Sequence, residues 1–211
     1  MEIIFISDMH TRHQTFTPSL QNGGDVIVCC GDITDMGTEQ ELRKFVAWYD
    51  ALPFTYKIVI AGNHDFIFEQ SPSLARHILN DTGIIYLENT EVVIDGLKFY
   101  GSPVTSNFNN WAFNKNYGAE IQHYWDKIPP DTDILITHGP PLGILDCSRQ
   151  GLHLGCAILK EAVRKIKPVV HAFGHIHEGY GTVSNEDIYY VNAALLNERY
   201  QPVHKPISVQ I

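Results

Sequence analysis

The chain has 211 residues, 44% of them hydrophobic, and its 15 lysines and arginines against 24 aspartates and glutamates give a formal net charge of −9. This length suits one substantial hydrophobic core, so we expect a single domain spanning residues 1–211. The negative charge disfavours nucleic-acid binding, which usually relies on clustered lysine and arginine. The sequence shows neither an apolar run of the ~20 residues of a membrane helix nor a signal-peptide pattern, so we expect a cytoplasmic protein with no membrane partner.

The four cysteines do not suggest a disulfide framework. Cys29 and Cys30 are adjacent on a predicted strand, where neighbouring side chains point to opposite faces, and Cys147 and Cys156 lie in a later loop and helix. We therefore expect reduced, buried thiols, as is usual in cytosolic proteins.

The first half of the chain alternates predicted strands with predicted helices. We expect strands over 3–7, 25–30 and 56–60, and at most a short helix within 11–24. A capping-box pattern at Thr38 and Glu41 opens a helix that ends near residue 51. Pro72 fits the first turn of a helix over 71–80. An Asp-Gly pair at 95–96 predicts a hairpin within 84–100, and hence antiparallel pairing at this edge.

The second half contains two long loops between its elements. The stretch 102–117 is rich in asparagine and aromatic residues and lacks periodicity, and long ordered loops in compact domains are often functional. We then expect helices over 119–127 and 154–166, strands over 134–137 and 169–173, and a loop over 139–151. Short strands are predicted at 181–183, 188–191 and 207–211. Strands alternating with helices are typical of an α/β protein.

Five predicted strands end in polar side chains of the same kinds. The run 58–61 stops at Gly62 and is followed by Asn63, His64 and Asp65. The other four apolar runs end in Asp8 with His10, in Asp32, in His138, and in His175 with His177. The carboxyl ends of strands are where α/β sheets place ligand sites. Aspartate, asparagine and histidine are metal ligands, so the strand ends predict one shared metal centre.

The number and spacing of these side chains indicate more than one metal ion. Asp8 and His10 are two residues apart, as are His175 and His177, so on an extended backbone each pair faces one side and can chelate. Asp32 is the natural bridge, because its carboxylate has two oxygens and the glycine before it allows close approach. The predicted ligands of two metal sites are Asp8, His10, Asp32, Asn63, His138, His175 and His177.

The ordered motifs resemble those of a known family. Asp8-x-His10, Gly31-Asp32, Gly62-Asn63-His64-Asp65, Thr137-His138-Gly139 and Gly174-His175-Ile176-His177 look like the signature of the calcineurin-like metallophosphoesterases. The stretches 56–64, 110–114, 137–143 and 177–181 are similar to its metallophosphoesterase-domain-containing, class III cyclic nucleotide phosphodiesterase subgroup. The resemblance, which covers nearly the whole chain, implies a four-layer αββα sandwich with mixed sheets and the site at strand carboxyl ends. It also implies metal-dependent phosphodiesterase activity, with cyclic nucleotides among the substrates.

The resemblance also implies roles for individual residues. One metal would take Asp8, His10, Asp32 and His177, and the other Asp32, Asn63, His138 and His175. Two divalent cations are expected, manganese first, with iron, zinc, nickel or cobalt as alternatives. His64 would contact the phosphate and protonate the leaving oxygen, and we expect Asp65 to orient its ring. Asn63 joins His64 as a candidate substrate contact. Apart from the resemblance, Arg12 lies just past the first motif, where it either contacts the phosphate or is a solvated or salt-bridged arginine.

The expected reaction follows from charge. Two divalent cations outweigh the two carboxylates, so the site attracts a small phosphodiester or nucleotide although the whole chain is negative. A hydroxide bridging the metals would attack phosphorus directly.

Several alternatives stay open at this point. The same centre could serve a phosphomonoesterase or phosphoprotein phosphatase, and a non-catalytic binding module is a third reading. Trp111 and Phe113 either stack a nucleobase or pack within their loop. The natural substrate, the metal used in the cell, the oligomeric state and protein partners are left undetermined.

Overall fold

The computed structural model describes residues 1–211, and most of its strands form two large sheets. The first sheet has the strand order β13-β1-β2-β3-β4. Strands β1, β2, β3 and β4 are parallel and β13 joins the edge antiparallel to β1. Their bounds are β1 Glu2–Ile6, β2 Gly24–Cys29, β3 Phe54–Val59, β4 Ile84–Tyr86 and β13 Ile207–Gln210.

The second sheet is mixed, with the order β11-β12-β10-β9-β6-β5. Its central strands β6, β9, β10 and β12 are parallel, and antiparallel strands close both edges. The bounds are β5 Thr90–Ile94, β6 Leu97–Ser102, β9 Ile134–Thr137, β10 Val170–Phe173, β11 Gly181–Asn185 and β12 Ile188–Asn192. A small separate pair, β7 (Thr105–Ser106) with β8 (Asn114–Lys115), lies in the loop after β6.

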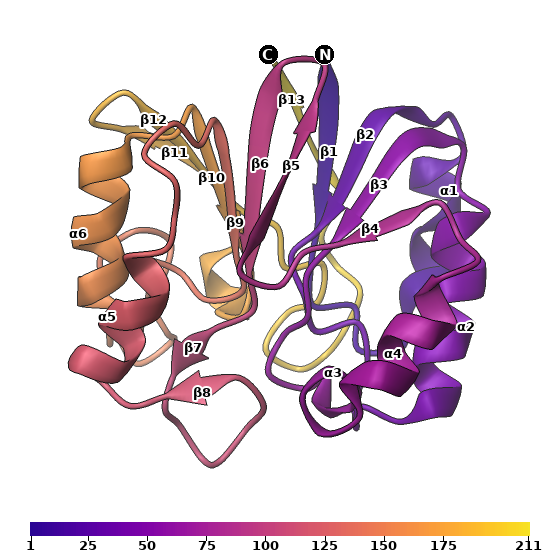
Figure 1. Cartoon of the computed structure of the whole chain (residues 1–211), viewed down its shortest axis with the longest axis horizontal. Coiled ribbons are helices and arrows are strands. Elements are labelled where there is room, and N and C mark those ends of the chain that lie inside the picture. The colour runs from indigo at the N-terminus through magenta and orange to yellow at the C-terminus, as the bar shows by residue number, and fades with distance from the viewer.

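Helices flank the two sheets on their outer sides (Figure 1). The first sheet is covered by α1 (Thr17–Leu20), α2 (Glu39–Asp50) and α4 (Pro72–Leu79), with the short α3 (Phe66–Gln70) below them. The second sheet is covered by α5 (Ala119–Trp125) and α6 (Ala157–Ile166). The molecule is thus the expected four-layer αββα sandwich with mixed sheets.

Three buried clusters correspond to the three interfaces between layers. The middle cluster joins the sheets and includes Phe5, Val28, Ile58 and Phe99. Alternate residues of the same strands join the cluster under α2 and α4, because strand side chains point to opposite faces in turn. A third cluster packs the second sheet against α5 and α6. Strands buried on both faces explain the continuous apolar runs of the sequence.

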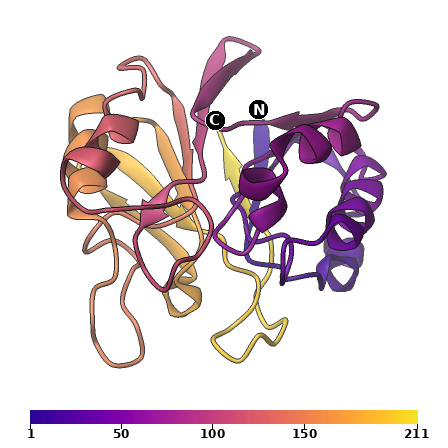
Figure 2. The same ribbon diagram turned by 60° about the horizontal axis from the view of Figure 1, so that its bottom comes forward.

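The parallel strands direct their carboxyl ends to one edge of the sandwich. The two chain termini lie at the opposite edge (Figure 1), and turning the molecule brings the loops of the polar edge forward (Figure 2). The sheets are also joined there, since the Leu195 amide donates to the Ser7 carbonyl (2.9 Å) in a parallel bridge after β12 and β1. This edge therefore collects loops from both halves of the fold.

The structure corrects four details of the expected elements. The β5–β6 hairpin is confirmed, but β4 pairs parallel to β3 rather than antiparallel. The helix expected from residue 154 begins at Ala157, because Cys156 is held in extended conformation as its N-cap and pairs with Pro141. The helix α3 and the small β7–β8 pair were not predicted.

All four cysteines are free thiols. Cys29 and Cys30 belong to different clusters, as their opposite orientations require. Cys147 is exposed, so the expectation that every thiol is buried is wrong for this residue. Among the helices, none combines the length and the apolar character that crossing a membrane requires.

Candidate metal centre

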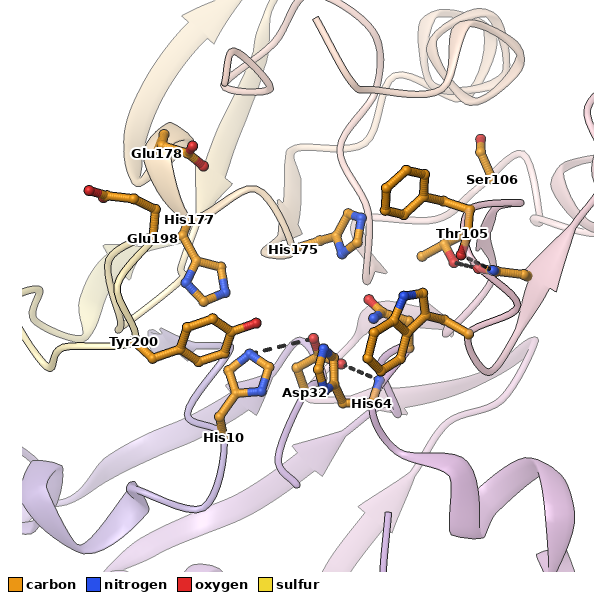
Figure 3. A pocket seen from close by; sticks show the side chains of 14 residues that line it. His10, Asp32, His64, Thr105, Ser106, His175, His177, Glu178, Glu198 and Tyr200 are labelled. Carbon is orange, nitrogen blue, oxygen red and sulfur yellow. Dashed lines mark hydrogen bonds and ion pairs between the residues drawn. The ribbon is translucent and has the colours of Figure 1, made fainter. Parts of the chain in front are cut away.

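All seven predicted ligand side chains converge at the shared strand edge. Asp32 is central: its Oδ2 lies 3.6 Å from His10 Nε2 and its Oδ1 lies 3.4 Å from His138 Nε2. On one side His177 Nε2 is 3.4 Å from Asp8 Oδ1. On the other side His138 Nε2 is 2.8 Å from Asn63 Oδ1. Figure 3 shows His10 and Asp32 facing His175 and His177 across the cavity.

The donor atoms form two groups that could each hold a cation. Asp8, His10 and His177 offer ligand atoms within 4.8 Å of one another, and so do Asp32, His138 and His175. A further triad of His10, Asp32 and His64 overlaps both, with Asp32 between them. Asp32 thus lies between the two groups, and the assignment of ligands to two metal ions stays a prediction.

The backbone that carries these side chains adopts unusual conformations. Asp8, His10, Asp32 and His175 have φ values of 52°, 41°, 51° and 67°, in the left-handed region that non-glycine residues rarely occupy. Such conformations cost of order 1–3 kcal/mol each and persist where the surrounding structure enforces them. The strand ends are therefore bent to aim donors inward at a cost in stability.

Glycines at two strand ends allow this crowding. A Cβ atom on Gly62 would overlap the Asp32 backbone nitrogen and carboxylate, and one on Gly174 would overlap the side chains of Ser7 and Asp8. Only a residue without a side chain fits either position.

Backbone carbonyls orient two of the histidines. The Nδ1 atom of His138 lies 2.9 Å from the Cys30 carbonyl, and that of His177 lies 2.9 Å from the Asn197 carbonyl. A carbonyl can only accept, so Nδ1 carries the proton and Nε2 faces the centre. Metal-binding histidines usually have such an outer partner.

The electrostatics of the centre keep its carboxylates ionised. Burial raises the pKa of Asp8, but the neighbouring His177 lowers this pKa by more than burial raises it, to about 2. Burial also raises the pKa of Asp32, and the neighbouring His138 lowers it by more, so that this pKa falls well below the usual range. Burial lowers the pKa of His10, and that of His175 to about 4, so both rings are neutral and their lone pairs are available.

The other two histidines are protonated more readily. Burial alone would lower their pKa values, but Asp32 raises the pKa of His138 to about 9 and Asp8 does the same for His177. A cation must displace these protons, since ligands bind metals in the deprotonated form.

Three buried atoms of the centre lack any hydrogen-bond partner: Asp8 Oδ1 and both ring nitrogens of His10. Buried polar atoms are normally paired, because an unpaired one retains its full desolvation cost. A divalent cation would satisfy Asp8 Oδ1 and one His10 nitrogen, and the mixed oxygen and imidazole donors suit manganese, iron or zinc. The residues present therefore fit the metals implied by the sequence.

His64 stands beside this donor set. Its backbone amide donates to Asp32 Oδ1 (2.8 Å), its Nδ1 lies 2.8 Å from the Asp35 carbonyl, and its ring stacks on Trp111 with centroids 4.2 Å apart. The orientation of the ring is thus fixed. Its Nδ1 is held by the Asp35 carbonyl, and its Nε2 is left for a ligand.

Asp65 does not orient the His64 ring, so that prediction is wrong. Its buried carboxylate accepts from the backbone amides of Ile33, Thr34 and Gly62, at 3.3, 2.9 and 2.7 Å. It ties the turn after β2 to the turn after β3. The Asp35 carbonyl takes the place at His64 that the sequence suggested for Asp65.

The structure also bears on Arg12 and Phe113. Arg12 donates to the His10 carbonyl (3.1 Å) and is not among the residues that line the cavity, so its contact with a substrate stays a prediction. Phe113 is buried in the core, 6% exposed, which excludes it from stacking on a nucleobase. Trp111 lines the cavity.

The structure adds cavity residues that the sequence reasoning missed. Tyr200 reaches the centre from the loop after β12, with ring centroids 4.7 Å from His10 and 5.3 Å from His177. Figure 3 shows its hydroxyl pointing inward, with Glu178 and Glu198 beyond His177. In the sequence, Tyr200 and Glu198 do not follow an apolar strand, so nothing predicts them as site residues. Glu178 could have been suspected only because it follows His177 directly.

Comparison with known proteins agrees with this geometry. The profile described as calcineurin-like phosphoesterase matches residues 1–179. The chain belongs to this family. It is therefore a metallophosphoesterase, a hydrolase of a family that uses a dimetal centre. The seven converging side chains all lie within the matched residues.

Several proteins are similar over much of the chain. Metallophosphoesterase domain-containing protein 1 of Homo sapiens is 38% identical, covering 99% of this chain and 70% of that protein. A probable glycerophosphodiester phosphodiesterase of Arcobacter nitrofigilis is 28% identical, covering 78% of this chain and 60% of that protein. Among solved structures, the phosphopantetheinyl hydrolase of Mycobacterium tuberculosis has a TM-score of 0.64 at 14% identity, covering 94% of this chain and 90% of that one. This last likeness supports the fold alone.

Proposed function

We propose that this chain hydrolyses small phosphodiesters with two divalent metal ions held at the strand edge. The observation that carries the proposal is the convergence of seven donor side chains, with Asp32 at their centre and with buried Asp8 and His10 atoms that make no hydrogen bond. Asp8, His10, Asp32 and His177 would hold one cation, and Asp32, Asn63, His138 and His175 the other. When bound, the two cations would supply positive charge for the phosphate and an activated water as nucleophile.

The remaining steps fall to the side chains of the chain. His64 would donate a proton from Nε2 to the leaving oxygen, while the Asp35 carbonyl and the Trp111 ring keep the imidazole in place. Asn63 would contact a phosphate oxygen beside it. Asp65 acts only as a positioning residue, because its hydrogen bonds join the loops that carry Asp32 and His64.

The diester preference is supported by the charges around the cavity. Its lining residues include Asp32, Glu178 and Glu198 but neither lysine nor arginine. Apart from the metals and a protonated His64, no cation would compensate the second negative charge of a phosphomonoester, whereas a diester carries one charge. The relative from Arcobacter nitrofigilis, named as a probable glycerophosphodiester phosphodiesterase, points in the same direction. Cyclic nucleotides as substrates, manganese as the metal and a cytoplasmic location are finer parts of this proposal.

Metal titration tests the ligand assignment directly. Metal-stripped protein should bind two manganese ions per chain in equilibrium dialysis, and His175→Gly should weaken one of the two sites at least tenfold. Exposed His123 serves as the matched control, since His123→Ala should keep both sites. Unchanged binding in His175→Gly, or a single site in the parent protein, would contradict the assignment.

A further inference from the structure

A second cavity, of about 430 Å³, adjoins the metal cavity of about 280 Å³. Five residues line both: Thr105, Ser106, Phe108, His175 and Glu178. One wall of the second cavity is thus also a wall of the metal centre. The second cavity is therefore next to the position that a phosphate held at the metals would occupy.

The second cavity is apolar where the metal cavity is polar. Seven of its 14 lining residues are hydrophobic, against three of 14 around the metal centre. Val104, Trp125 and Leu159 are buried walls, exposed by 1%, 2% and 1%. Leu154 and Phe108, 51% and 66% exposed, add apolar surface that is open to solvent. A concave lining that combines apolar side chains with a few polar groups is typical of ligand pockets.

The charges near the second cavity disfavour an anionic occupant. Its lining residues contain no lysine or arginine, and their one carboxylate is the exposed Glu178. The occupant that fits is therefore uncharged, apolar and of ring size.

We propose that the second cavity, lined by Val104, Phe108, Trp125, Leu154 and Leu159, is the subsite for an uncharged, ring-sized ester group of the phosphodiester. The inference rests on the proposed function, because it requires the phosphate to lie at the metal centre. It makes esters of aromatic or cyclic alcohols the preferred substrate class over esters of small alkyl alcohols.

Ligand binding measured by calorimetry tests the subsite without turnover. Manganese-loaded protein should bind the monomethyl ester of phenylphosphonate about tenfold more tightly than the monomethyl ester of methylphosphonate. Both are singly charged diester analogues, and the ring buries apolar surface while the headgroup is shared. The P-monomethyl ester of phosphonoacetate, which adds a charge instead of a ring, should bind no more tightly than the methylphosphonate ester. Equal binding of the phenyl and methyl compounds would overturn the subsite and leave the proposed function standing. Absence of binding by both would overturn the proposed function and the subsite together.

Matched surface variants locate the effect. Leu154→Asp should reduce the phenyl preference to threefold or less, whereas Leu152→Asp should retain it, because Leu152 is similarly exposed (56%) but lines neither cavity. Phe108→Ala should also reduce the preference, and Tyr117→Ala, 67% exposed and outside both cavities, should not. Metal content should be equal in all four variants. Retention of the full preference in both Leu154→Asp and Phe108→Ala would place the ring elsewhere and overturn the inference.

Discussion

His64 is predicted to act in the chemical step and not in metal binding, so its substitution should affect the two differently. His64→Ala should keep both metal ions and lower kcat by roughly a hundred- to ten-thousand-fold for a diester with an alkyl leaving group, as expected on losing a general acid. The loss should be much smaller for a p-nitrophenyl diester, whose leaving group needs little protonation. Steady-state kinetics on both substrates, with metal analysis, checks this. Equal loss on both substrates would contradict the acid role.

Gly62 tests how closely the strand ends must approach. Gly62→Ala would press a Cβ atom against the Asp32 carboxylate and backbone, so we expect weaker metal binding and a loss of about 1–3 kcal/mol in the free energy of unfolding. Gly83→Ala is the control, because a Cβ atom there meets only Asp50 Oδ1 at 3.5 Å. Denaturant unfolding and metal titration measure both effects. A Gly62→Ala protein as stable as the control variant would show that the turn relaxes freely.

The convergence of the candidate donor side chains could be predicted from the sequence, and their outer partners could not. Asp8, Asp32 and His138 directly follow apolar runs, so strand geometry alone brings them together. The partner of His64 could not be read in this way, because it is the backbone carbonyl of Asp35, which any residue could supply. Asp65 was misassigned because adjacency in sequence says little about where a side chain points in a tight turn.

At the scale of elements, the start of α2 matters because it follows the loop whose Asp35 carbonyl contacts the His64 ring. Thr38 and Glu41 form both hydrogen bonds of the capping box, and Glu41 also accepts from the Met36 amide (3.3 Å). Thr38→Ala should therefore cost about 1 kcal/mol of unfolding free energy. Gln40→Ala, exposed on the same helix, should change it by less than about 0.5 kcal/mol. Chemical denaturation of both variants provides the measurement, and equal stabilities would contradict the cap.

The elements with strong local signals were predicted well, and those set by tertiary contacts were not. The capping box located α2, and an Asp-Gly turn located the β5–β6 hairpin. By contrast, the three residues of β4 carry no signal for parallel pairing with β3, which depends on contacts with the rest of the fold. Likewise, the bridge to Pro141 holds Cys156 extended where the sequence suggested helix. Short segments such as these take the conformation that their neighbours impose.

At the scale of the whole molecule, buried His171 predicts a loss of stability in acid. Burial lowers its folded pKa from 6.5 to about 3, so below pH 6.5 the unfolded chain binds a proton that the folded one does not. The loss begins as the pH falls through 6.5 and is complete near pH 3. It amounts to about 2 kcal/mol between pH 7 and pH 5.

A variant isolates this contribution. His171→Gln keeps a polar group near Thr137, 2.8 Å from the original ring nitrogen, but does not titrate. Its free energy of unfolding should fall less than that of the parent protein between pH 7 and 5, by about 2 kcal/mol. Denaturant titrations at both pH values give the difference, and parallel pH profiles would refute it. A single transition in those titrations would also support the predicted single domain.

The central claim is that this molecule is a metal-dependent phosphodiesterase. The most direct measurement compares hydrolysis of bis-p-nitrophenyl phosphate and p-nitrophenyl phosphate by metal-stripped protein, with manganese, iron, zinc, nickel or cobalt restored singly. We predict turnover that requires metal and a higher kcat/KM for the diester. Preference for the monoester, or no turnover by protein shown to hold two metal ions, would contradict it.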